Sequence, residues 1–465
     1  MTMARENPLF LKESTFALAT DLYELTMAAG YFRAGLDEPA SFELFVRDMP
    51  PHRSYLLVAG LEQAVHYLRR LRFPGKTIDY LRQQEVFAHV EPEFFEYLRE
   101  FRFGGDVDAM PEGTVAFADE PLLQVTAPLI QAQIVETYLL ATVNFQTLVA
   151  TKASRVVAAA QGRPVVDFGT RRAHGPQAGL AAARAAYIGG CAGTSNVLAG
   201  YEMGIPIFGT QAHSWVMSFD SEAQAFQAYF DVFPEHTTLL LDTYDTLEAA
   251  RKATVFGPSL SGVRLDSGKL ASLSRRTRRI LDEAGMTDTR ILASGDLNEY
   301  RIESLLKQDA QIDGFGVGTD LVTSRDAPAL GGVYKLVEQQ RGGRDVPRLK
   351  ASSGKGTYPG KKQVRRLADR RGRYRRDVVC LAAEEDCEGR ALLIPILRDG
   401  RRVQPLPALD AIRGRAARDL QLLPPRCRRL HDPEAYPVEA SNALRKLRDE
   451  IIEQIEGDSH QGGDA

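Results

Sequence analysis

The chain has 465 residues, of which 44% are hydrophobic and 26% charged, and its formal net charge at pH 7 is −3. This length predicts two or three domains, and the composition is that of a folded globular protein, which excludes wholesale disorder. The near balance of charge gives no overall electrostatic reason to expect nucleic acid or an anionic membrane as a partner, so any anion site must be local.

Neither the cysteines nor the N-terminus points to secretion. The four cysteines are too few for a disulfide framework, and no pair has the close spacing of a zinc knuckle. Residues 1–12 lack the basic start and apolar core of a signal peptide. No stretch approaches the roughly 18 to 20 apolar residues that a membrane-spanning helix needs. We therefore expect a cytoplasmic protein without a membrane partner.

The first 160 residues mix helices and strands. Apolar residues at three- and four-residue spacing predict helices, and alternating apolar residues predict a strand. The predicted helices are 21–32, 57–71 and one or two within 130–160, and the predicted strands are 40–47 and several short ones within 101–128. We therefore expect an α+β domain over residues 1–160.

From residue 164 the pattern changes to short apolar strands that alternate with helices. The predicted strands are 165–168, 206–208, 238–241, 262–265, 290–293 and 314–317, and the helices between them are 176–188, 195–203, 221–231, 246–254, 270–284 and 298–307. Such alternation implies parallel strands joined by right-handed crossovers. Residues 161–340 are therefore predicted to form an α/β domain, either a barrel or an open doubly wound sheet.

Residues 341–465 are predicted to form a small C-terminal extension, rich in β-structure and ending in a helix. Residues 341–376 are dense in Arg, Lys and Gly, and 365–379 predict a hairpin that turns near Arg371 and Gly372. A basic run is usually a solvated face, and contact with a phosphate or another subunit is the alternative. Residues 451–465 are expected to fray.

Polar side chains gather where the six predicted strands end. They are Asp167, Arg171, Arg172, Thr210, His213, Asp242, Asp245, Arg264, Asp266, Ser294, Asp296, Gly318, Thr319 and Asp320. The carboxyl ends of parallel strands share one face, and that face carries the active site in α/β architectures. We therefore predict one rim that collects arginines, carboxylates, hydroxyls and a histidine.

Two of these strand ends carry glycine turns that suit a phosphate. They are Gly314-Phe-Gly-Val-Gly-Thr-Asp and Ser294-Gly295-Asp296. Glycine lets backbone amides approach a phosphate closely, and the following helix adds partial positive charge. Turn geometry alone is the alternative reason for each glycine, and neither turn is a Walker loop, but two such turns on adjacent strands support each other.

Four of the polar residues allow a structural as well as a functional interpretation. His213, in the stretch GTQAHSWV, is either a hydrogen-bonded core histidine or a working group. Asp266 and Asp296 each precede a predicted helix and could simply cap it. Arg264 interrupts the apolar strand GVRL, so it must find a carboxylate from the protein or from a ligand.

Ordered stretches of the chain resemble the nicotinate phosphoribosyltransferases. They are TDLYELTMAAGY, FELFVRDMP, MPEGT, NFQTLVATKASR, DFGTRRAHGPQ, GTSNVLAGYEMGIPIFGTQAHSWV, LLLDTYDT, VRLDSG and GFGVGTDLVTS, which run from near the N-terminus to about residue 365. The resemblance implies synthesis of nicotinate mononucleotide from nicotinate and 5-phosphoribosyl 1-diphosphate in NAD biosynthesis, coupled to ATP hydrolysis. It also implies an irregular (β/α) barrel and a homodimer with the site between subunits.

The resemblance also implies roles for residues at matching positions. Tyr23 looks like the aromatic that a neighbouring subunit places against the pyridine ring. The positions that match base binding are Thr210, Arg264 and Arg171, and those that match phosphate binding are Gly316, Gly318 and Thr319, with Ser294 and Gly295 in the second phosphate-compatible turn. His213 resembles the histidine that ATP phosphorylates, while Asp242 and Asp266 would stabilise an oxocarbenium-like centre. Mg²⁺ is expected to accompany the phosphates.

Two positions bear on the choice of substrate and metal. At Ser195 the similar nicotinamide enzyme carries an aspartate, so a serine favours the anion nicotinate. The family usually has DSGDL where this chain has DSGKL, so Lys269 inverts a charge near the phosphates. We expect altered metal dependence or substrate affinity, unless Lys269 points to solvent. The alternative functions are a nicotinamide or quinolinate phosphoribosyltransferase and a non-catalytic relative that binds a phosphorylated metabolite.

Overall fold

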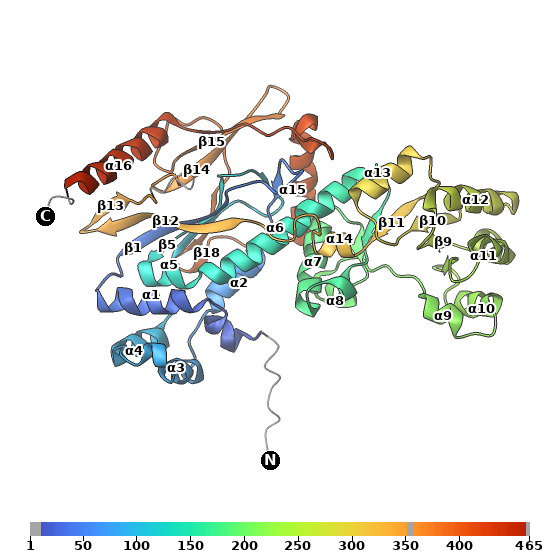
Figure 1. Cartoon of the computed structure of the whole chain (residues 1–465), viewed down its shortest axis with the longest axis horizontal. Helices are drawn as coiled ribbons and strands as arrows, with labels where there is room; N and C mark the ends of the chain where they lie inside the picture. Colours follow the sequence, from blue (N-terminus) through green and yellow to red (C-terminus); the bar gives the residue numbers. More distant parts are fainter. Residues whose placement is uncertain (1–10, 351–356, 462–465) are drawn as a thin grey trace, which may run out of the picture.

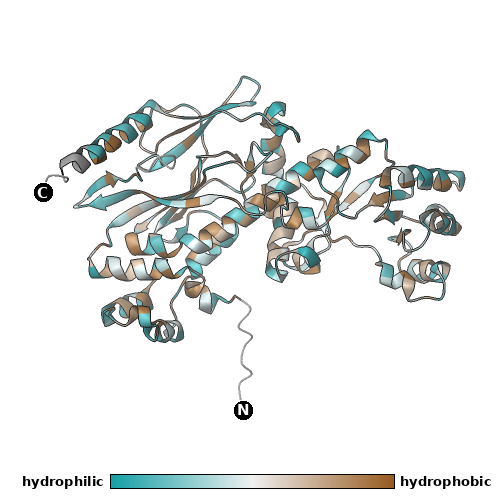
Figure 2. Ribbon diagram, in the orientation of Figure 1, coloured by the Kyte–Doolittle hydropathy of each residue, from teal (hydrophilic) through white to brown (hydrophobic). Residues whose placement is uncertain are grey.

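In the computed structural model, which describes residues 11–350 and 357–461, the chain forms two lobes joined by one long helix, α6 (Glu136–Ala159) (Figure 1). Residues 1–10, where we expected no signal peptide, lie outside the described residues. The two largest hydrophobic clusters lie around the seven-stranded sheet of the first lobe and around the parallel sheet of the second. Figure 2 shows apolar residues along the strands of both sheets and along α6. No described helix combines the length and the hydropathy that crossing a membrane requires.

The first lobe is built on a seven-stranded antiparallel sheet. Its strands, in spatial order, are β13 (Arg344–Pro347), β12 (Gly332–Arg341), β1 (Pro39–Val46), β5 (Pro121–Pro128), β3 (Asp106–Ala109), β17 (Ile394–Arg398) and β18 (Arg401–Arg402), and β2 (Leu56–Leu57) pairs separately with β4 (Val115–Ala116). The helices of this lobe are η1 (Glu13–Leu18), α1 (Leu22–Arg33), α2 (Leu61–Arg70), α3 (Gly75–Arg82), η2 (Glu85–Phe87), α4 (Pro92–Glu100) and α5 (Leu129–Ile134). Strands from both ends of the chain therefore complete one sheet.

A four-stranded sheet and two longer helices make up the rest of the C-terminal segment. The strands, in spatial order, are β16 (Arg390–Ala391), β14 (Lys362–Ala368), β15 (Tyr374–Leu381) and β19 (Val438–Ala440), and the helices are α15 (Leu409–Leu422), η5 (Pro425–Arg428) and α16 (Asn442–Gln461). The predicted hairpin is confirmed as β14 and β15. The expected fraying is wrong as far as Gln461, because α16 continues through it; residues 462–465 lie outside the described residues.

The second lobe contains a six-stranded parallel sheet. Its strands, in spatial order, are β7 (Gly193–Thr194), β6 (Val165–Asp167), β11 (Gly314–Val317), β10 (Arg290–Ala293), β9 (Gly262–Leu265) and β8 (Thr238–Leu240). The register aligns Leu292 of β10 with Arg264 on one side and with Gly314 on the other. The carboxyl ends of β9, β10 and β11 therefore lie side by side, as predicted.

Helices connect these strands in the predicted alternation. They are η3 (Thr170–Arg172), α7 (Pro176–Ile188), α8 (Val197–Met203), α9 (His213–Met217), α10 (Glu222–Val232), α11 (Thr246–Ala253), η4 (Thr254–Ser259), α12 (Leu270–Glu283), α13 (Glu299–Lys307) and α14 (Thr319–Val322). The strand predicted at 206–208 is wrong, because only Ile207 makes a bridge there, to Thr194.

The fold is therefore mixed α/β, with a parallel sheet in one lobe and, in the other, sheets that are antiparallel except for the parallel pair β15 and β19. The predicted barrel stays a prediction, because within the described residues no ladder joins Ile207 to β8. The domain boundaries at residues 160 and 340 also stay a prediction. The four cysteines, Cys191, Cys380, Cys387 and Cys427, are free.

Candidate active site

Arg264 lies at the centre of a polar cluster at the carboxyl end of the parallel sheet. Its neighbours in β9 are buried in the core, whereas its own side chain stays partly exposed on the other face of the strand. Nε donates to Ser294 Oγ at 2.7 Å and Nη1 donates to Thr210 Oγ1 at 2.6 Å. Nη2 donates to Asp266 Oδ1 at 2.7 Å. One guanidinium group thus joins three predicted site residues from three different loops.

Two carboxylates meet beside this arginine. The Asp266 amide donates to Asp242 Oδ2 at 3.2 Å, and Ser267 Oγ donates to the same oxygen at 2.5 Å. Burial alone would raise the pKa of Asp266, but hydrogen bonds from Ser294 and Arg264, together with the charge of Arg264, hold that pKa below its usual value. Asp266 is therefore a carboxylate at neutral pH. The other oxygen of Asp242, Oδ1, is buried and has no hydrogen-bond partner in the described part of the chain.

His213 is the first residue of α9 and faces the carboxylates across the rim. Its Nδ1 lies 3.2 Å from Thr243 Oγ1, and its Nε2 lies 3.9 Å from Asp266 Oδ2. The side chain is 41% exposed, so the interpretation of His213 as a core histidine is wrong. Its imidazole is held at one nitrogen and open to a ligand at the other.

The two glycine turns lie next to each other, at the ends of β10 and β11. Gly295 has a φ of 90°, and a Cβ there would lie 1.8 Å from the Asp266 carbonyl oxygen, so only glycine allows this close approach. A Cβ on Gly316 would lie 2.4 Å from the Phe168 ring. Gly318 then precedes Thr319, the first residue of α14. At both turns the backbone reaches the rim without a side chain covering it, which suits the binding of a phosphate by backbone N–H groups.

The capping alternative for the two aspartates is wrong. The N-cap of α12 is Lys269, which makes no side-chain cap, and Asp266 lies three residues before it. The N-cap of α13 is Asn298, whose Oδ1 accepts from the Arg301 amide at 3.0 Å. Asp245, by contrast, does cap α11. The Asp266 side chain therefore belongs to the cluster around Arg264 and does not cap a helix.

The rim residues near β6 divide into structural and exposed ones. Asp167 is fully buried, and its carboxylate accepts from the Gly169 amide at 2.8 Å and from Thr194 Oγ1 at 2.7 Å. Burial raises its pKa, and it holds the loop in place. Ser195 is half-buried just beyond β7. Arg171 is exposed, and its Nη1 lies 3.4 Å from the Phe168 carbonyl oxygen.

Tyr23 is the one predicted site residue that lies far along the molecule from the cluster. It belongs to α1 in the first lobe, and its side chain is 44% exposed. Within the described residues, no hydrogen bond or ion pair links Tyr23 to the cluster around Arg264. Its predicted role therefore requires a second subunit.

Three residues of the cluster were not predicted. Thr243 contacts His213, as described above, and the Phe168 ring lies 5.8 Å from the Arg264 guanidinium carbon. Gln211 is buried, and neither polar atom of its side chain has a partner within the described residues. All three lie within stretches that resemble the family, next to predicted residues, so their place in those stretches was the available signal.

The described residues include no group of three or more His, Cys, Asp or Glu side chains that could hold a metal ion. A Mg²⁺ ion, however, commonly binds one or two carboxylates and takes its remaining ligands from phosphates and water. Asp242, with its unpartnered oxygen beside Asp266, fits that smaller requirement.

Three family models match the chain in order. They describe the nicotinate phosphoribosyltransferase N-terminal domain (residues 18–144), the nicotinate phosphoribosyltransferase family (164–339) and the nicotinate phosphoribosyltransferase C-terminal domain (385–448). The chain is 47% identical to nicotinate phosphoribosyltransferase pncB2 of Mycobacterium tuberculosis, with 93% of each chain covered. It is 39% identical to the nicotinate phosphoribosyltransferase of Bacillus subtilis, over 96% of this chain and 98% of the relative.

A solved structure has the same fold. The crystal structure of human nicotinic acid phosphoribosyltransferase matches with a TM-score of 0.83 and 32% sequence identity, covering 93% of this chain and 99% of the human one. The similarity therefore extends over both lobes.

Proposed function

Because the chain belongs to the nicotinate phosphoribosyltransferase family, we propose that it makes nicotinate mononucleotide and diphosphate from nicotinate and 5-phosphoribosyl 1-diphosphate, with ATP hydrolysis coupled through a phosphohistidine at His213. The observation that carries this proposal is the Arg264 guanidinium, which joins Thr210, Ser294 and Asp266 within reach of His213. The reaction would serve NAD salvage.

The phosphoryl step begins at the free nitrogen of His213. In the tautomer whose Nδ1–H donates to Thr243 Oγ1, 3.2 Å away, the lone pair is on Nε2. Nε2 attacks the γ-phosphorus of ATP, an N–P bond forms, the bond to the bridging oxygen breaks and ADP leaves with that electron pair. Water later cleaves the N–P bond and releases phosphate. The protein contributes mainly position and charge to this step.

In the glycosyl step the pyridine nitrogen attacks C1 of the ribose, and the bond to the diphosphate oxygen breaks. Positive charge builds on the ribose as diphosphate departs. Asp242 and Asp266 place negative charge on the rim where it would stabilise that centre, and the lowered pKa of Asp266 keeps this carboxylate ionised. The turns at Gly295 and at Gly316, Gly318 and Thr319 would hold the phosphates.

The base is proposed to be nicotinate because the site presents cations and hydroxyls to it. The planar fork of Arg264 suits a carboxylate, and Thr210 lies against it. Ser195 adds no negative charge that would repel an anion. Arg171, exposed at the rim, is a further candidate for the base.

Mg²⁺ is proposed to arrive with the phosphates. Asp242 would supply a carboxylate oxygen, and the metal would neutralise charge on the departing diphosphate. The chain's own residues would orient the two substrates around it.

We propose a homodimer in which Tyr23 enters the partner's site. Large apolar side chains are exposed on α8 and the segment after it, namely Val197, Leu198, Tyr201, Ile207 and Phe208. An exposed apolar group of this size usually marks an interface. Tyr23 is exposed on the other lobe, and a side chain that enters the site of a partner subunit must be exposed in its own subunit. We also keep as proposals the barrel form of the second lobe and the cytoplasmic location.

Incubation with nicotinate, phosphoribosyl diphosphate, Mg²⁺ and ATP labelled at the γ-phosphate tests the proposal. We expect mononucleotide and a labelled protein. Absence of product with nicotinate, nicotinamide and quinolinate in turn would exclude the enzyme and leave a non-catalytic binder. Product without label would exclude only the role of His213.

A further inference from the structure

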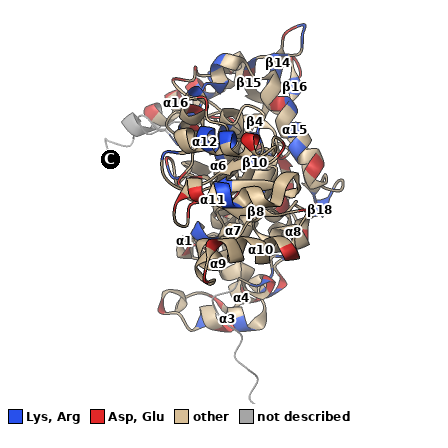
Figure 3. Ribbon diagram, turned by 90° about the vertical axis from the view of Figure 1, so that its right-hand side faces the viewer, with Lys and Arg blue, Asp and Glu red and all other residues tan. Residues whose placement is uncertain are grey.

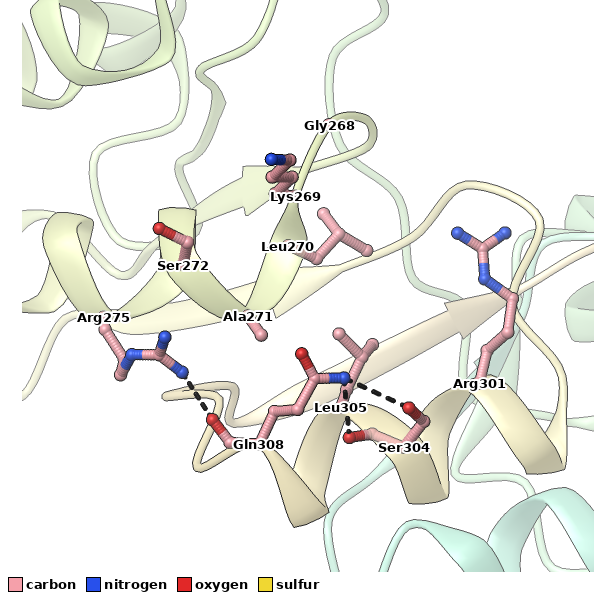
Figure 4. Close-up of a pocket in the computed structure, with 10 residues that line it drawn as sticks. All are labelled: Gly268, Lys269, Leu270, Ala271, Ser272, Arg275, Arg301, Ser304, Leu305 and Gln308. Atoms are coloured by element: carbon pink, nitrogen blue, oxygen red, sulfur yellow. Dashed lines mark hydrogen bonds between the residues drawn. The ribbon is translucent and has the colours of Figure 1, made fainter.

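A hollow lies between α12 and α13, just outside the cluster around Arg264. It has a volume of about 320 Å³ and is lined by Gly268, Lys269, Leu270, Ala271, Ser272, Arg275, Arg301, Ser304, Leu305 and Gln308. Figure 4 shows why space remains there: Gly268, Ala271 and the serines are small, and Leu270 and Leu305 form an apolar floor.

The lining is cationic. Its only ionisable side chains are Lys269, Arg275 and Arg301, so it carries three formal positive charges and no carboxylate. Figure 4 places these three side chains around the edge of the hollow, and all three are exposed to solvent. Figure 3 shows the same concentration of Lys and Arg along α12. An anion entering the hollow therefore meets attraction from several sides.

The three cations differ in how firmly they are held. Arg275 donates to the Gln308 carbonyl oxygen, and Arg301 donates to the Asp296 carbonyl oxygen at 2.8 Å. Each arginine thus stays in place with other N–H groups still free. Within the described residues, the side chain of Lys269 makes no hydrogen bond or ion pair, whereas its carbonyl oxygen accepts from the Leu273 amide at 2.9 Å. Lys269 is also the N-cap of α12, so it lies next to the backbone N–H groups of Ala271 and Ser272. The first N–H groups of a helix have no carbonyl partner within that helix.

The lining of the hollow begins close to the catalytic rim, at Gly268 and Lys269, which follow Asp266 along the chain. Lys269 follows Asp266 by three residues, a span of at most about 11 Å. Arg301 is tied to the turn that contains Gly295, and that turn touches the Asp266 backbone. A phosphate chain with one end beside His213 or on the glycine turns can therefore extend past Gly268 into the hollow.

We propose that this hollow is a polyphosphate subsite, in which Lys269, Arg275 and Arg301 bind the part of a phosphate chain that projects from the catalytic rim. The inference rests on the proposed function, because it is the reaction that brings such chains to the rim. The chain has two possible sources, the triphosphate of the nucleotide that phosphorylates His213 and the diphosphate of the sugar donor.

The test is calorimetric titration of the full protein, with Mg²⁺, using a non-hydrolysable ATP analogue, phosphoribosyl diphosphate and inorganic diphosphate as separate probes. Lys269→Ala and Arg275→Ala are each expected to weaken at least one probe about tenfold or more, since each removes a charged hydrogen-bond donor. Lys269→Arg should retain most of the affinity, and Lys269→Asp should lose more than Lys269→Ala. Arg279→Ala, an exposed α12 arginine outside the lining, is the matched control.

The pattern across probes identifies the source. A loss confined to the ATP analogue assigns the hollow to the nucleotide, and a loss confined to phosphoribosyl diphosphate assigns it to the sugar donor. Unchanged dissociation constants for all three probes in both alanine variants would overturn the proposal. These titrations do not depend on catalysis, so failure of His213 to become labelled would exclude the proposed coupling and leave this result to stand by itself.

Discussion

The Nη2 atom of Arg264 lies 2.7 Å from Oδ1 of Asp266, and Ser294 donates to the same carboxylate oxygen. Asp266 is therefore the carboxylate that pairs with Arg264, the arginine that interrupts the apolar strand β9. The pair leaves the guanidinium with its other donors on Ser294 and Thr210, so the arginine is oriented before any substrate binds. The protein thereby fixes this positive charge at the rim, where it would attract the carboxylate of nicotinate.

Arg264→Lys is therefore expected to damage binding of nicotinate. Lysine keeps the charge but cannot reach Ser294, Thr210 and Asp266 together, since its ammonium is a single point. We expect kcat/KM for nicotinate to fall about tenfold or more. Steady-state kinetics with nicotinate varied will measure this, with Arg290→Lys, an exposed arginine at the other end of the sheet, as control. Equal values for the two variants would contradict the role of Arg264.

His213→Asn is expected to abolish labelling by ATP and to leave the fold intact. Asparagine can still contact Thr243 but offers no nucleophilic nitrogen. ATP hydrolysis should fall to background, while mononucleotide synthesis continues without coupling and needs higher substrate concentrations. Protein-bound label and ADP release measure the effect, and His236→Asn, at an exposed histidine, is the control. Label that persists in His213→Asn would place the phosphoryl group elsewhere.

The alternation of strand and helix was predicted well where apolar runs are short and bounded. β9, β10 and β11 begin and end at the predicted residues. The segment 206–208 failed because its side chains are exposed, so its apolar pattern reflects a surface and not a core strand. β7 and α9 were missed because two and five residues are too few to produce a periodicity.

The candidate site was predictable because parallel strand ends share one face. That rule brought together Thr210, Arg264, Asp266 and Ser294 from distant positions in the sequence. The rule could not predict Thr243 or Gln211 as members of the site, because a loop side chain next to a predicted residue can point toward the site or away from it. It also could not place Tyr23, because the proposed contact between subunits would leave no mark on the periodicity of one chain.

Subunit complementation tests the predicted crossing of Tyr23. Tyr23→Ala and Arg264→Ala are each expected to retain little activity alone, since each damages both sites of a homodimer. After subunit exchange in equal amounts, half of the dimers are mixed and each has one intact site, so about a quarter of wild-type activity should return. The mixture is assayed against each variant alone after the same treatment. No recovery despite demonstrated exchange would place Tyr23 in its own subunit's site, or outside any site.

Glu24, in the first turn of α1, gives the stability of the protein a pH dependence. Burial raises its pKa to about 7, although donors from Thr137 and Thr20 partly offset this. The folded state therefore favours the protonated form: the contribution is full below the unfolded-state pKa and is lost as pH rises through about 7. Glu24→Gln should remove this loss, which is at most about 3 kcal/mol.

Urea unfolding of wild type and Glu24→Gln at pH 5 and pH 8 measures the difference. Relative to the variant, the wild type is expected to lose free energy of unfolding between the two pH values. Glu93→Gln, at an exposed position in α4, should follow the wild type at both. Parallel behaviour of wild type and Glu24→Gln would contradict the assignment.

Lys152 Nζ lies 2.6 Å from Glu299 Oε2, and both side chains are almost completely buried, so this pair ties α6 to the start of α13. Lys152→Met removes the cation and leaves Glu299 with Arg155 alone, which is expected to cost about 3 to 5 kcal/mol of unfolding free energy. Lys307→Met breaks an exposed pair with Glu303 in the same helix and should cost less than about 1 kcal/mol. The double variant Lys152→Met, Glu299→Leu should not recover the loss, because it leaves the equally buried Arg155 without its carboxylate partner. Urea unfolding of all three variants measures these losses of unfolding free energy. Equal losses for Lys152→Met and Lys307→Met would mean that burial does not strengthen the ion pair between α6 and α13.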